Sequence, residues 1–249
     1  MIPKEGEKLA FVTVRNLRKV YLLGKEKVVA LKHIDLDIER GEICCILGTS
    51  GSGKSTLLNM LAGLEKPTKG DIIINGVNVA KMSEGKLASF RQETTGFIFQ
   101  SYNLINQFNA IENVGMPLMF KGMSRSERDR KARQMLKLVG LGKRLGHRPN
   151  QMSGGQQQRV GIARAFVAKP KLVFADEPTG NLDTKTTDEV MRLMVRMCRK
   201  HNITLIIVTH DLEIARYTDR IVHIIDGEIT SIENNESVCP VDDDITETV

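Results

Sequence analysis

The chain has 249 residues, 41% of them hydrophobic, and its 36 Lys and Arg against 30 Asp and Glu give a formal charge of +6. This length suits one large α/β core, and no apolar run approaches the roughly 18 residues of a membrane-spanning helix. Residues 1–10 are charged and lack a signal-peptide core, so we expect a protein on the cytoplasmic side. The net charge alone does not choose between nucleic acid, anionic lipid and nucleotide as a partner.

The N-terminal part of the chain is rich in expected strands. Val, Ile and Leu cluster at residues 10–14 and 28–38, and Gly41-Glu42 turns the chain into an apolar run at 42–47. A further strand at 71–74 ends at the Asn75-Gly76 turn, a short helix follows from about Ser83, and a strand at 95–99 ends on Gln100.

The segment after the run at 42–47 fits the pattern G-x-x-x-x-G-K-[ST]. Its glycines let successive backbone N–H groups point inward, and the helix that begins near its end adds the positive end of a helix dipole. We therefore predict a phosphate-binding loop, with Lys54 reaching the outer phosphates and Ser55 joining the coordination shell of Mg²⁺. The residues assigned to this site are Gly48, Thr49, Ser50, Gly51, Ser52, Gly53, Lys54, Ser55 and Thr56.

From Gln100 to about Met152 the pattern turns helical, which predicts an inserted helical subdomain at about 101–152. Within it, Ser124 and Glu127 match a capping box that would start a helix, and Gly140 is a plausible end for that helix. The densest basic run of the chain lies here: Arg125, Arg128, Arg130, Lys131 and Arg133. We interpret it as a solvated helix face and expect no nucleic acid partner, because acidic residues interrupt the run and aromatics are sparse.

After the insert, helices and strands alternate. A helix from about Gly155 to Pro170 is followed by a strand at 171–175, by a helix whose Val190, Leu193, Met194 and Met197 share a core-facing side, and by a strand at 203–208. This alternation predicts a largely parallel sheet with helices on both faces. Asp226-Gly227 indicates a terminal hairpin, and we predict one domain over 1–232 with a weakly ordered acidic tail at 233–249.

Three expected strand ends carry polar side chains. Asp176 and Glu177 follow the strand at 171–175, His210 follows the strand at 203–208, and Gln100 ends the strand at 95–99. Ligands of open α/β sheets bind at this edge, so Asp176 suits a magnesium partner and Glu177 a residue that polarises an attacking water. An ordinary helix start, which Pro178 supports in part, is the alternative for Asp176-Glu177. A lone His is more often structural, and a lone Gln is a weak signal.

A second anion-binding helix start is predicted at Ser153-Gly154-Gly155-Gln156, although a structural cap is the plain alternative. Since one nucleotide needs one phosphate cradle, two cradles suggest that each completes the other's site in a dimer. Cys44, Cys45, Cys198 and Cys239 show no C-x-x-C spacing, and we interpret them as reduced packing residues.

Together these residues resemble the ATP-binding subunit of an ABC transporter over about Phe11 to Ile232. Gly48 to Ser55 is similar to the family's Walker A loop, Leu172 to Asp176 to Walker B, and Ser153 to Gln156 to its signature peptide, with Met152 where the family usually has Leu. The resemblance implies an α/β P-loop NTPase fold, with a largely parallel core sheet, an N-terminal antiparallel β subdomain and an inserted helical subdomain.

The resemblance also implies roles for individual residues. Glu177 would be the catalytic base, His210 the switch histidine and Gln100 the Q-loop residue. Tyr21 would stack on adenine, and Asp183 would be the last residue of the D-loop. Mg²⁺ would be held by Ser55, Gln100 and Asp176. Two chains would form a head-to-tail homodimer around two ATP, each bound by one chain's Walker A loop and by Ser153, Gly154, Gly155, Gln156 and Asp183 of the other.

Residues 96–100 and 176–183 resemble the branch that contains the macrolide exporter, the lipoprotein-release ATPase, the antimicrobial-peptide resistance ATPases and the cell-division ATPase. That branch implies a peripheral subunit at the cytoplasmic face of the membrane and a permease with few spans and a large extracytoplasmic domain. Two alternatives stay open: a soluble ABC-type ATPase acting on nucleic acid or ribosomes, and a cell-division regulator acting through a membrane partner.

Overall fold

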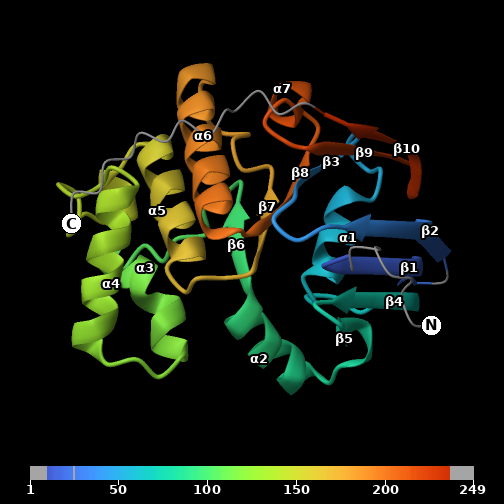
Figure 1. The fold of residues 1–249 in the computed structure, drawn as a ribbon, viewed down its shortest axis with the longest axis horizontal. Coiled ribbons are helices and arrows are strands. Elements are labelled where there is room, and N and C mark those ends of the chain that lie inside the picture. Colours follow the sequence, from blue (N-terminus) through green and yellow to red (C-terminus); the bar gives the residue numbers. More distant parts are fainter. Residues whose placement is uncertain (1–9, 25, 236–249) are drawn as a thin grey trace.

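The computed structural model describes residues 10–24 and 26–235 (Figure 1). The strands of this part are β1 (Val12–Leu23), β2 (Glu26–Ile38), β3 (Ile43–Leu47), β4 (Lys69–Ile74), β5 (Val77–Asn78), β6 (Thr95–Phe99), β7 (Leu172–Asp176), β8 (Thr204–Thr209), β9 (Arg220–Ile225) and β10 (Glu228–Asn234). The α-helices are α1 (Lys54–Leu61), α2 (Glu84–Thr94), α3 (Ala110–Phe120), α4 (Arg125–Leu138), α5 (Gly154–Phe166), α6 (Thr184–His201) and α7 (Leu212–Ala215).

The described strands form one sheet in the order β5-β4-β1-β2-β10-β9-β3-β8-β7-β6. β1 pairs antiparallel with β2 and β4, and β4 pairs antiparallel with β5, which confirms the expected N-terminal antiparallel part. β1 is much longer than the apolar cluster at 10–14 suggested. The register of its pairing shifts between Val14 and Leu17, and such an irregularity breaks the strict alternation by which a strand is recognised in a sequence.

The core of the sheet is parallel, as predicted: β3 pairs with β8 and β9, and β7 pairs with β6 and β8. All residues of β3 and β8 are buried, as expected for parallel strands covered on both faces. Alternate residues point to different cores. Phe174 of β7 packs in the core that contains Leu57 of α1, whereas Val173 packs in the core that contains Ile162 of α5 and Met194 of α6.

The two cores correspond to two sides of the central strands in Figure 1. α1 lies on one side of β6 and β7 with the N-terminal strands, and α3 to α6 lie on the other. The predicted methionine stripe of α6 is confirmed as core packing, since Met194 and Met197 are buried. The three described cysteines, Cys44, Cys45 and Cys198, are free and buried, as expected; Cys239 lies outside the described residues.

The insert between β6 and α5 consists mainly of α3 and α4. The predicted capping box at Ser124 forms only in half: the Ser124 hydroxyl accepts a hydrogen bond from the Glu127 N–H at 3.4 Å, but the Glu127 carboxylate bonds the Ser124 hydroxyl instead of its backbone. A complete capping box forms at Asn109 and Glu112, which start α3. Gly140 follows the end of α4 with φ of 81°, as a helix-stopping glycine does.

Two predicted boundaries were wrong. α5 ends at Phe166, four residues before Pro170, because a proline excludes a helix at its own position without fixing where the helix ends. β10 continues through Glu233 to Asn234, so the strand crosses the predicted start of the acidic tail. The rest of that tail, 236–249, lies outside the described residues. The hairpin at Asp226-Gly227 is confirmed, with φ of 47° and 78° at the two turn residues.

Within residues 10–24 and 26–235, no helix combines the length and the apolar character of a membrane span.

Candidate functional site

The polar residues singled out at the strand ends lie at one edge of the parallel sheet. Strand pairing places Leu47 opposite Thr209, Val208 opposite Asp176, and Asp176 opposite Phe99. Because these strands are parallel and adjacent, their carboxyl ends meet, and the segments that follow them begin side by side. The fold therefore brings the loop at 48–53, Asp176-Glu177, His210 and Gln100 to a common edge.

The loop between β3 and α1 has the geometry of an anion cradle. Gly53 has φ of 99°, and a Cβ atom there would lie 2.7 Å from the Ala30 carbonyl oxygen, so only glycine fits. Gly53 is also the N-cap of α1, and it provides no side-chain hydrogen bond to the first turn. The first backbone N–H groups of α1 are consequently available to an anion.

Lys54 is 7% exposed, and its ammonium group donates a hydrogen bond to the Thr49 carbonyl at 2.7 Å. Among the described residues, no carboxylate forms an ion pair with it, although a buried ammonium strongly favours an anionic partner. The buried Ser52 hydroxyl also has no hydrogen-bond partner. Ser52 lies in the loop and Lys54 is the first residue of α1, so a phosphate bound there would give both groups a partner that the described chain does not provide.

Asp176 has a buried carboxylate oxygen, Oδ1, without a hydrogen-bond partner. Burial and, next, the charge of Glu177 raise the pKa of Asp176, while the Ser55 hydroxyl and the Lys54 ammonium oppose the rise. A carboxylate oxygen and a hydroxyl beside each other are the hard oxygen donors that Mg²⁺ prefers. The described residues hold no cluster of three or more His, Cys, Asp and Glu that could bind a metal, so phosphate and water oxygens would have to complete the shell.

Glu177 adopts a left-handed backbone conformation with φ of 46°, which is unusual for a residue with a side chain. Its N–H donates to the Val208 carbonyl at 2.9 Å, and its carboxylate accepts a hydrogen bond from the Thr209 hydroxyl at 3.0 Å. The other carboxylate oxygen lies 2.7 Å from Nδ1 of His210. Strained conformations of this kind cost about 1–3 kcal/mol and occur at functional sites, where the surroundings fix them.

Thr209 was missed in the sequence, although it directly precedes His210. A threonine that ends a buried strand is ordinary, and only the pairing of β7 with β8 places its hydroxyl on the Glu177 carboxylate.

Gln100 directly follows β6 at the same edge, and its neighbour there is the loop after β7. A Cβ atom on Gly180 would lie 2.7 Å from Gln100 Nε2, and the Asn181 side chain donates to the Gln100 carbonyl at 3.0 Å. The position of the Gln100 side chain therefore depends on the position of the loop at 178–183, which it contacts.

Ser153 to Gln156 form the start of α5 as a complete capping box: the Ser153 hydroxyl accepts from the Gln156 N–H at 3.4 Å, and the Gln156 side chain accepts from the Ser153 N–H at 3.2 Å. The glycines between them allow close packing. A Cβ atom on Gly154 would lie 2.8 Å from the Tyr102 hydroxyl, and one on Gly155 would lie 2.5 Å from the Thr186 methyl group.

α5 and the loop after β7 are physically linked. The buried Gln158 side chain donates to the Pro178 carbonyl, and Asp183 caps α6, accepting from the Thr186 N–H at 3.0 Å. Met152, the departure from the family pattern, is buried in the core with α5. Sequence reasoning passed over Gln158 because a glutamine inside a helix carries no signal by itself.

No hydrogen bond between described residues joins 153–156 to the loop at 48–53, and Figure 1 shows α5 and α1 on opposite sides of the central strands. The fold of one chain thus gathers the loop, Asp176, Glu177 and His210, and leaves the start of α5 apart from the loop at 48–53.

Tyr21 lies on β1 beside the start of α1. Its hydroxyl donates to the Glu65 carboxylate at 2.6 Å, and the Lys19 ammonium lies 4.9 Å from the centre of its ring. Partial burial and Glu65 raise the pKa of Tyr21, while a hydrogen bond with Thr56 lowers it. The ring is therefore held next to α1, the helix that follows the loop. A single tyrosine in the sequence did not indicate this position.

A hollow of about 470 Å³ adjoins the loop. Gly48, Thr49 and Ser50 line one part of it, and His210 lines another. The exposed side chains of Leu212 and Ile225 make its outer wall apolar.

Comparison with known proteins gives consistent matches. The family model described as ABC transporter matches residues 31–180. The lipoprotein-releasing system ATP-binding protein LolD of Geobacter metallireducens is 46% identical, over 89% of this chain and 99% of that protein. The macrolide export ATP-binding/permease protein MacB of Rhodopirellula baltica is 45% identical, over 87% of this chain and 32% of that longer protein.

Among solved structures, the ATP-binding cassette MJ0796 of Methanocaldococcus jannaschii, a dimer in a post-hydrolysis state bound to ADP and Pi, is similar with a TM-score of 0.84. It is 41% identical, and the match covers 90% of this chain and 99% of that one.

Proposed function

The chain belongs to the ABC transporter family as an ATP-binding subunit with ATPase activity, and we propose that it uses the edge formed by β3, β8, β7 and β6 to drive a separately encoded membrane permease. The observation that carries this proposal is the meeting of the loop at 48–53, Asp176, Glu177 and His210 at that edge. We propose one ATPase domain that includes all of β10, to Asn234, with its helical insert at about 101–152.

The contacts of the site residues support the roles that we propose for them. The loop from Gly48 to Gly53 and the first turn of α1 bind the phosphates, Lys54 pairs with the outer phosphate oxygens, and Tyr21 stacks on adenine. Glu177 orients the attacking water and accepts its proton, and Thr209 and His210 position the Glu177 carboxylate.

Asp176 and Ser55 fit a Mg²⁺ ion, because the buried Oδ1 of Asp176 has no partner and the Ser55 hydroxyl lies beside it. Gln100 would join them once the loop at 178–183, which it contacts, is in place. When bound, Mg²⁺ neutralises charge on the transferred phosphoryl group.

A homodimer in the ATP state completes the site. The start of α5 is capped, carries two glycines and lies apart from the loop of its own chain, so Ser153 to Gln156 would contact the ATP held by a second copy. Asp183 would accompany them, since its loop packs against Gly154 through Leu182 and Asn181. The dimeric MJ0796 structures supply the precedent for such an arrangement.

A groove of about 720 Å³ between β6 and α3 is suited to a segment of the permease. Phe97 and Phe99 of β6 and Met116 and Phe120 of α3 line it, and Phe120 is 65% exposed. An apolar groove in contact with both β6 and the insert could pass a movement of the permease to the site. Docking there would hold the chain peripherally on the cytoplasmic face of the membrane.

The partner that we propose is a permease with few spans and a large extracytoplasmic domain, as the resemblance of residues 96–100 and 176–183 implies. The similarity to a lipoprotein-releasing and a macrolide-export protein supports a partner in the membrane. The test is a detergent pull-down of the tagged Glu177→Gln variant from its host with ATP, followed by mass spectrometry. Recovery of such a permease, reduced severalfold by Phe120→Ala, supports the proposal. Recovery of ribosomal proteins or nucleic acid without a membrane partner would overturn it.

ATP binding has its own test. Lys54→Ala removes the buried ammonium, so titration calorimetry should show ATP affinity lowered by at least about tenfold. Unchanged affinity would contradict the assignment of the loop.

A further inference from the structure

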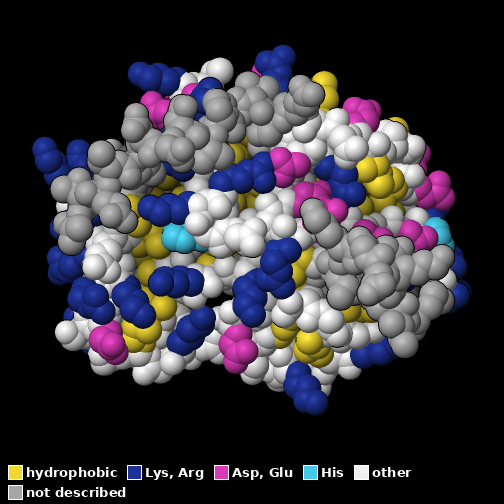
Figure 2. All heavy atoms as spheres, viewed as in Figure 1, with side chains coloured by type: hydrophobic (Ala, Val, Ile, Leu, Met, Phe, Trp, Pro, Cys, Tyr) yellow, Lys and Arg dark blue, Asp and Glu magenta, His cyan; other side chains and the backbone are white. Residues whose placement is uncertain are grey.

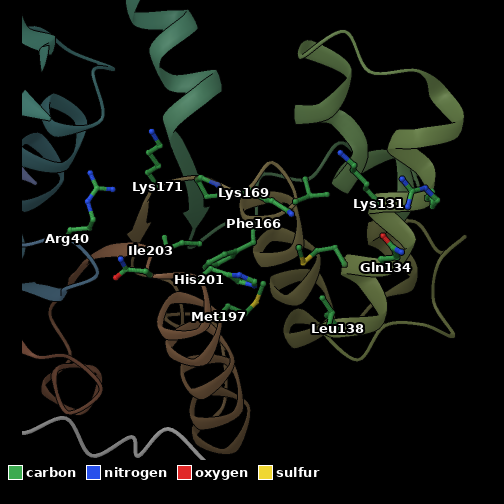
Figure 3. A pocket seen from close by; sticks show the side chains of 15 residues that line it. Arg40, Lys131, Gln134, Leu138, Phe166, Lys169, Lys171, Met197, His201 and Ile203 are labelled. Carbon is green, nitrogen blue, oxygen red and sulfur yellow. The ribbon is translucent and has the colours of Figure 1, made fainter. Parts of the chain in front are cut away.

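A second cavity, of about 670 Å³, lies between the end of α4, the connection from α5 to β7, and the end of α6 (Figure 3). Lys171 directly precedes β7, and Ile203 directly precedes β8. The cavity is therefore at the amino-terminal edge of the parallel strands, away from the carboxyl edge where the ATP site is formed. We call it the basic groove.

The basic groove is lined by cations without acidic partners. Five of its lining residues are Lys or Arg: Arg40, Arg130, Lys131, Lys169 and Lys171. No Asp or Glu lines it, and within the described chain none of the five takes part in an ion pair. The Arg40 guanidinium donates a hydrogen bond to the neutral side-chain amide of Asn75 and lies over the ring of Phe11.

The surroundings of His201 show the same excess of positive charge. Its pKa is lowered by partial burial and by the nearby Lys200 and Lys169 ammonium groups. Figure 2 shows Lys and Arg side chains gathered around apolar surface on the part of the molecule that α4, α5 and α6 occupy in Figure 1.

The centre of the groove is apolar. Phe166 and Met197 lie there next to His201, and Leu138, on α4, is 61% exposed. A ligand that fits would therefore combine several carboxylates with aliphatic side chains, as an acidic peptide does.

The chain itself carries such a peptide. Residues 236–249 include Glu236, Asp242, Asp243, Asp244 and Glu247, contain no Lys or Arg, and place Val241 and Ile245 on either side of the three aspartates. This complementarity of charge and of apolar groups favours the segment over a partner molecule, since it is tethered to the same fold and its effective concentration is high.

The segment leaves the described fold close to the groove. The Asn235 N–H donates to the Asp219 carbonyl at 2.7 Å, and the Asp219 side chain pairs with Arg199. Arg199 in turn donates to the carbonyl of Gly41, the neighbour of Arg40. Asp242 follows Asn235 by seven residues, and an extended chain of that length reaches about 23 Å.

We propose that the acidic segment 236–249 binds in the basic groove of its own chain, with Asp242 to Asp244 facing the five cations and Ile245 over the apolar floor. Bound there, it joins the end of β10 to α4 of the helical insert. The inference concerns an edge of the molecule that the ATP site does not use, and it goes beyond the proposed function.

The test compares lysine reactivity in the full chain and in the variant Asp242→Asn/Asp243→Asn/Asp244→Asn, without nucleotide. Lys131, Lys169 and Lys171 should react severalfold faster with an acylating reagent in the variant, whereas Lys137, which does not line the groove, should react equally in both. The difference should largely disappear at about 1 M salt, because screening weakens exposed ion pairs. Equal reactivity of the groove lysines in the two proteins would overturn the proposal.

A zero-length carbodiimide cross-link, mapped by mass spectrometry, identifies the occupant. In the wild-type protein, cross-links should join one of the three aspartates at 242–244 to Lys131, Lys169 or Lys171. In an equal mixture of isotope-labelled and unlabelled chains, each cross-link should join two residues of the same chain. Links only between chains would assign the groove to a second copy. Protection of the same lysines by phosphatidylglycerol vesicles, with no link to the aspartates, would assign it to lipid. Either result contradicts the proposal.

Discussion

Glu177 is the residue that we propose as the catalytic base. Its backbone is strained, with φ of 46°, and its carboxylate is fixed on both oxygens by Thr209 and His210. A base held in this way needs little reorganisation before it accepts a proton.

We expect Glu177→Gln to retain ATP affinity within a factor of about three and to lower the hydrolysis rate by about 10²–10⁴, because the amide keeps the shape of the side chain and loses the base. Steady-state phosphate release and ATP titration measure the two effects separately. Thr209→Val, which removes one hydrogen bond to the carboxylate, should reduce the rate less. A turnover near that of the wild type in Glu177→Gln would remove this residue from the role.

The buried thiols make stability sensitive to alkaline pH. Burial raises the pKa of Cys45 to about 12, and it raises those of Cys44 and Cys198 even further above their ordinary value of 9.0. Above pH 9 the unfolded chain loses these protons and the folded chain keeps them, so the stability that is complete below pH 9 is lost as pH rises toward the folded pKa values.

Each thiol should lower the free energy of unfolding by about 1.4 kcal/mol per pH unit in this range. Urea unfolding of wild type and Cys198→Ala, compared between pH 9.5 and 10.5, isolates one of them. The variant's slope should be shallower by that amount, whatever the cost of the cavity at a single pH. Parallel slopes would show that Cys198 is accessible to solvent.

At the level of elements, the start of α5 depends on close packing with α6. The space at Gly155 is already filled by the Thr186 methyl group, 2.5 Å from where a Cβ atom would lie. A side chain there must push the two helices apart.

Gly155→Ala should therefore lower the free energy of unfolding by about 1–3 kcal/mol, as overpacking does. Gly85→Ala in α2 is the matched control, since a Cβ atom there meets nothing within 4 Å, and it should stabilise by about 0.5–1 kcal/mol. Thr186→Ser removes the obstructing methyl group and should restore most of the loss in a double variant. Thermal unfolding curves of the wild type, the single variants and the double variant measure these effects. If Thr186→Ser does not restore stability, the strain does not arise from the contact between residues 155 and 186.

At the level of the whole molecule, the two segments that we propose to bind ATP lie apart within one chain. The loop at 48–53 and the start of α5 lie on opposite sides of the central strands, so one chain does not bring them together (Figure 1). Assembly is thus expected to be part of the reaction cycle.

We expect Glu177→Gln with ATP and Mg²⁺ to elute as a dimer in size exclusion with light scattering, because slow hydrolysis preserves the ATP that joins the two chains. Adding Ser153→Arg to this variant should give a monomer that still binds ATP, since the arginine obstructs only the contact across the interface. A dimer that persists with Ser153→Arg would show that the start of α5 is not at the interface.

The sequence by itself determined the elements and the residues at their ends. Gly48 to Ser55, Asp176-Glu177 and Ser153 to Gln156 are recognisable because phosphate loops, strand ends and helix caps are set by neighbouring residues, and the apolar periods of β7, β8 and α6 report their burial directly. The same reasoning failed where no local rule applies: at the irregular β1, at the end of α5 and at the last residues of β10.

Only the tertiary structure decided which of these residues meet. Thr209 reaches Glu177 because β7 and β8 pair, and Gln100 meets Gly180 of the loop after β7. The basic groove is assembled from segments as distant in sequence as Arg40, Lys131 and Lys171. Such contacts depend on strand order and helix docking, which are fixed by the packing of the whole core and leave no periodic trace in any one segment.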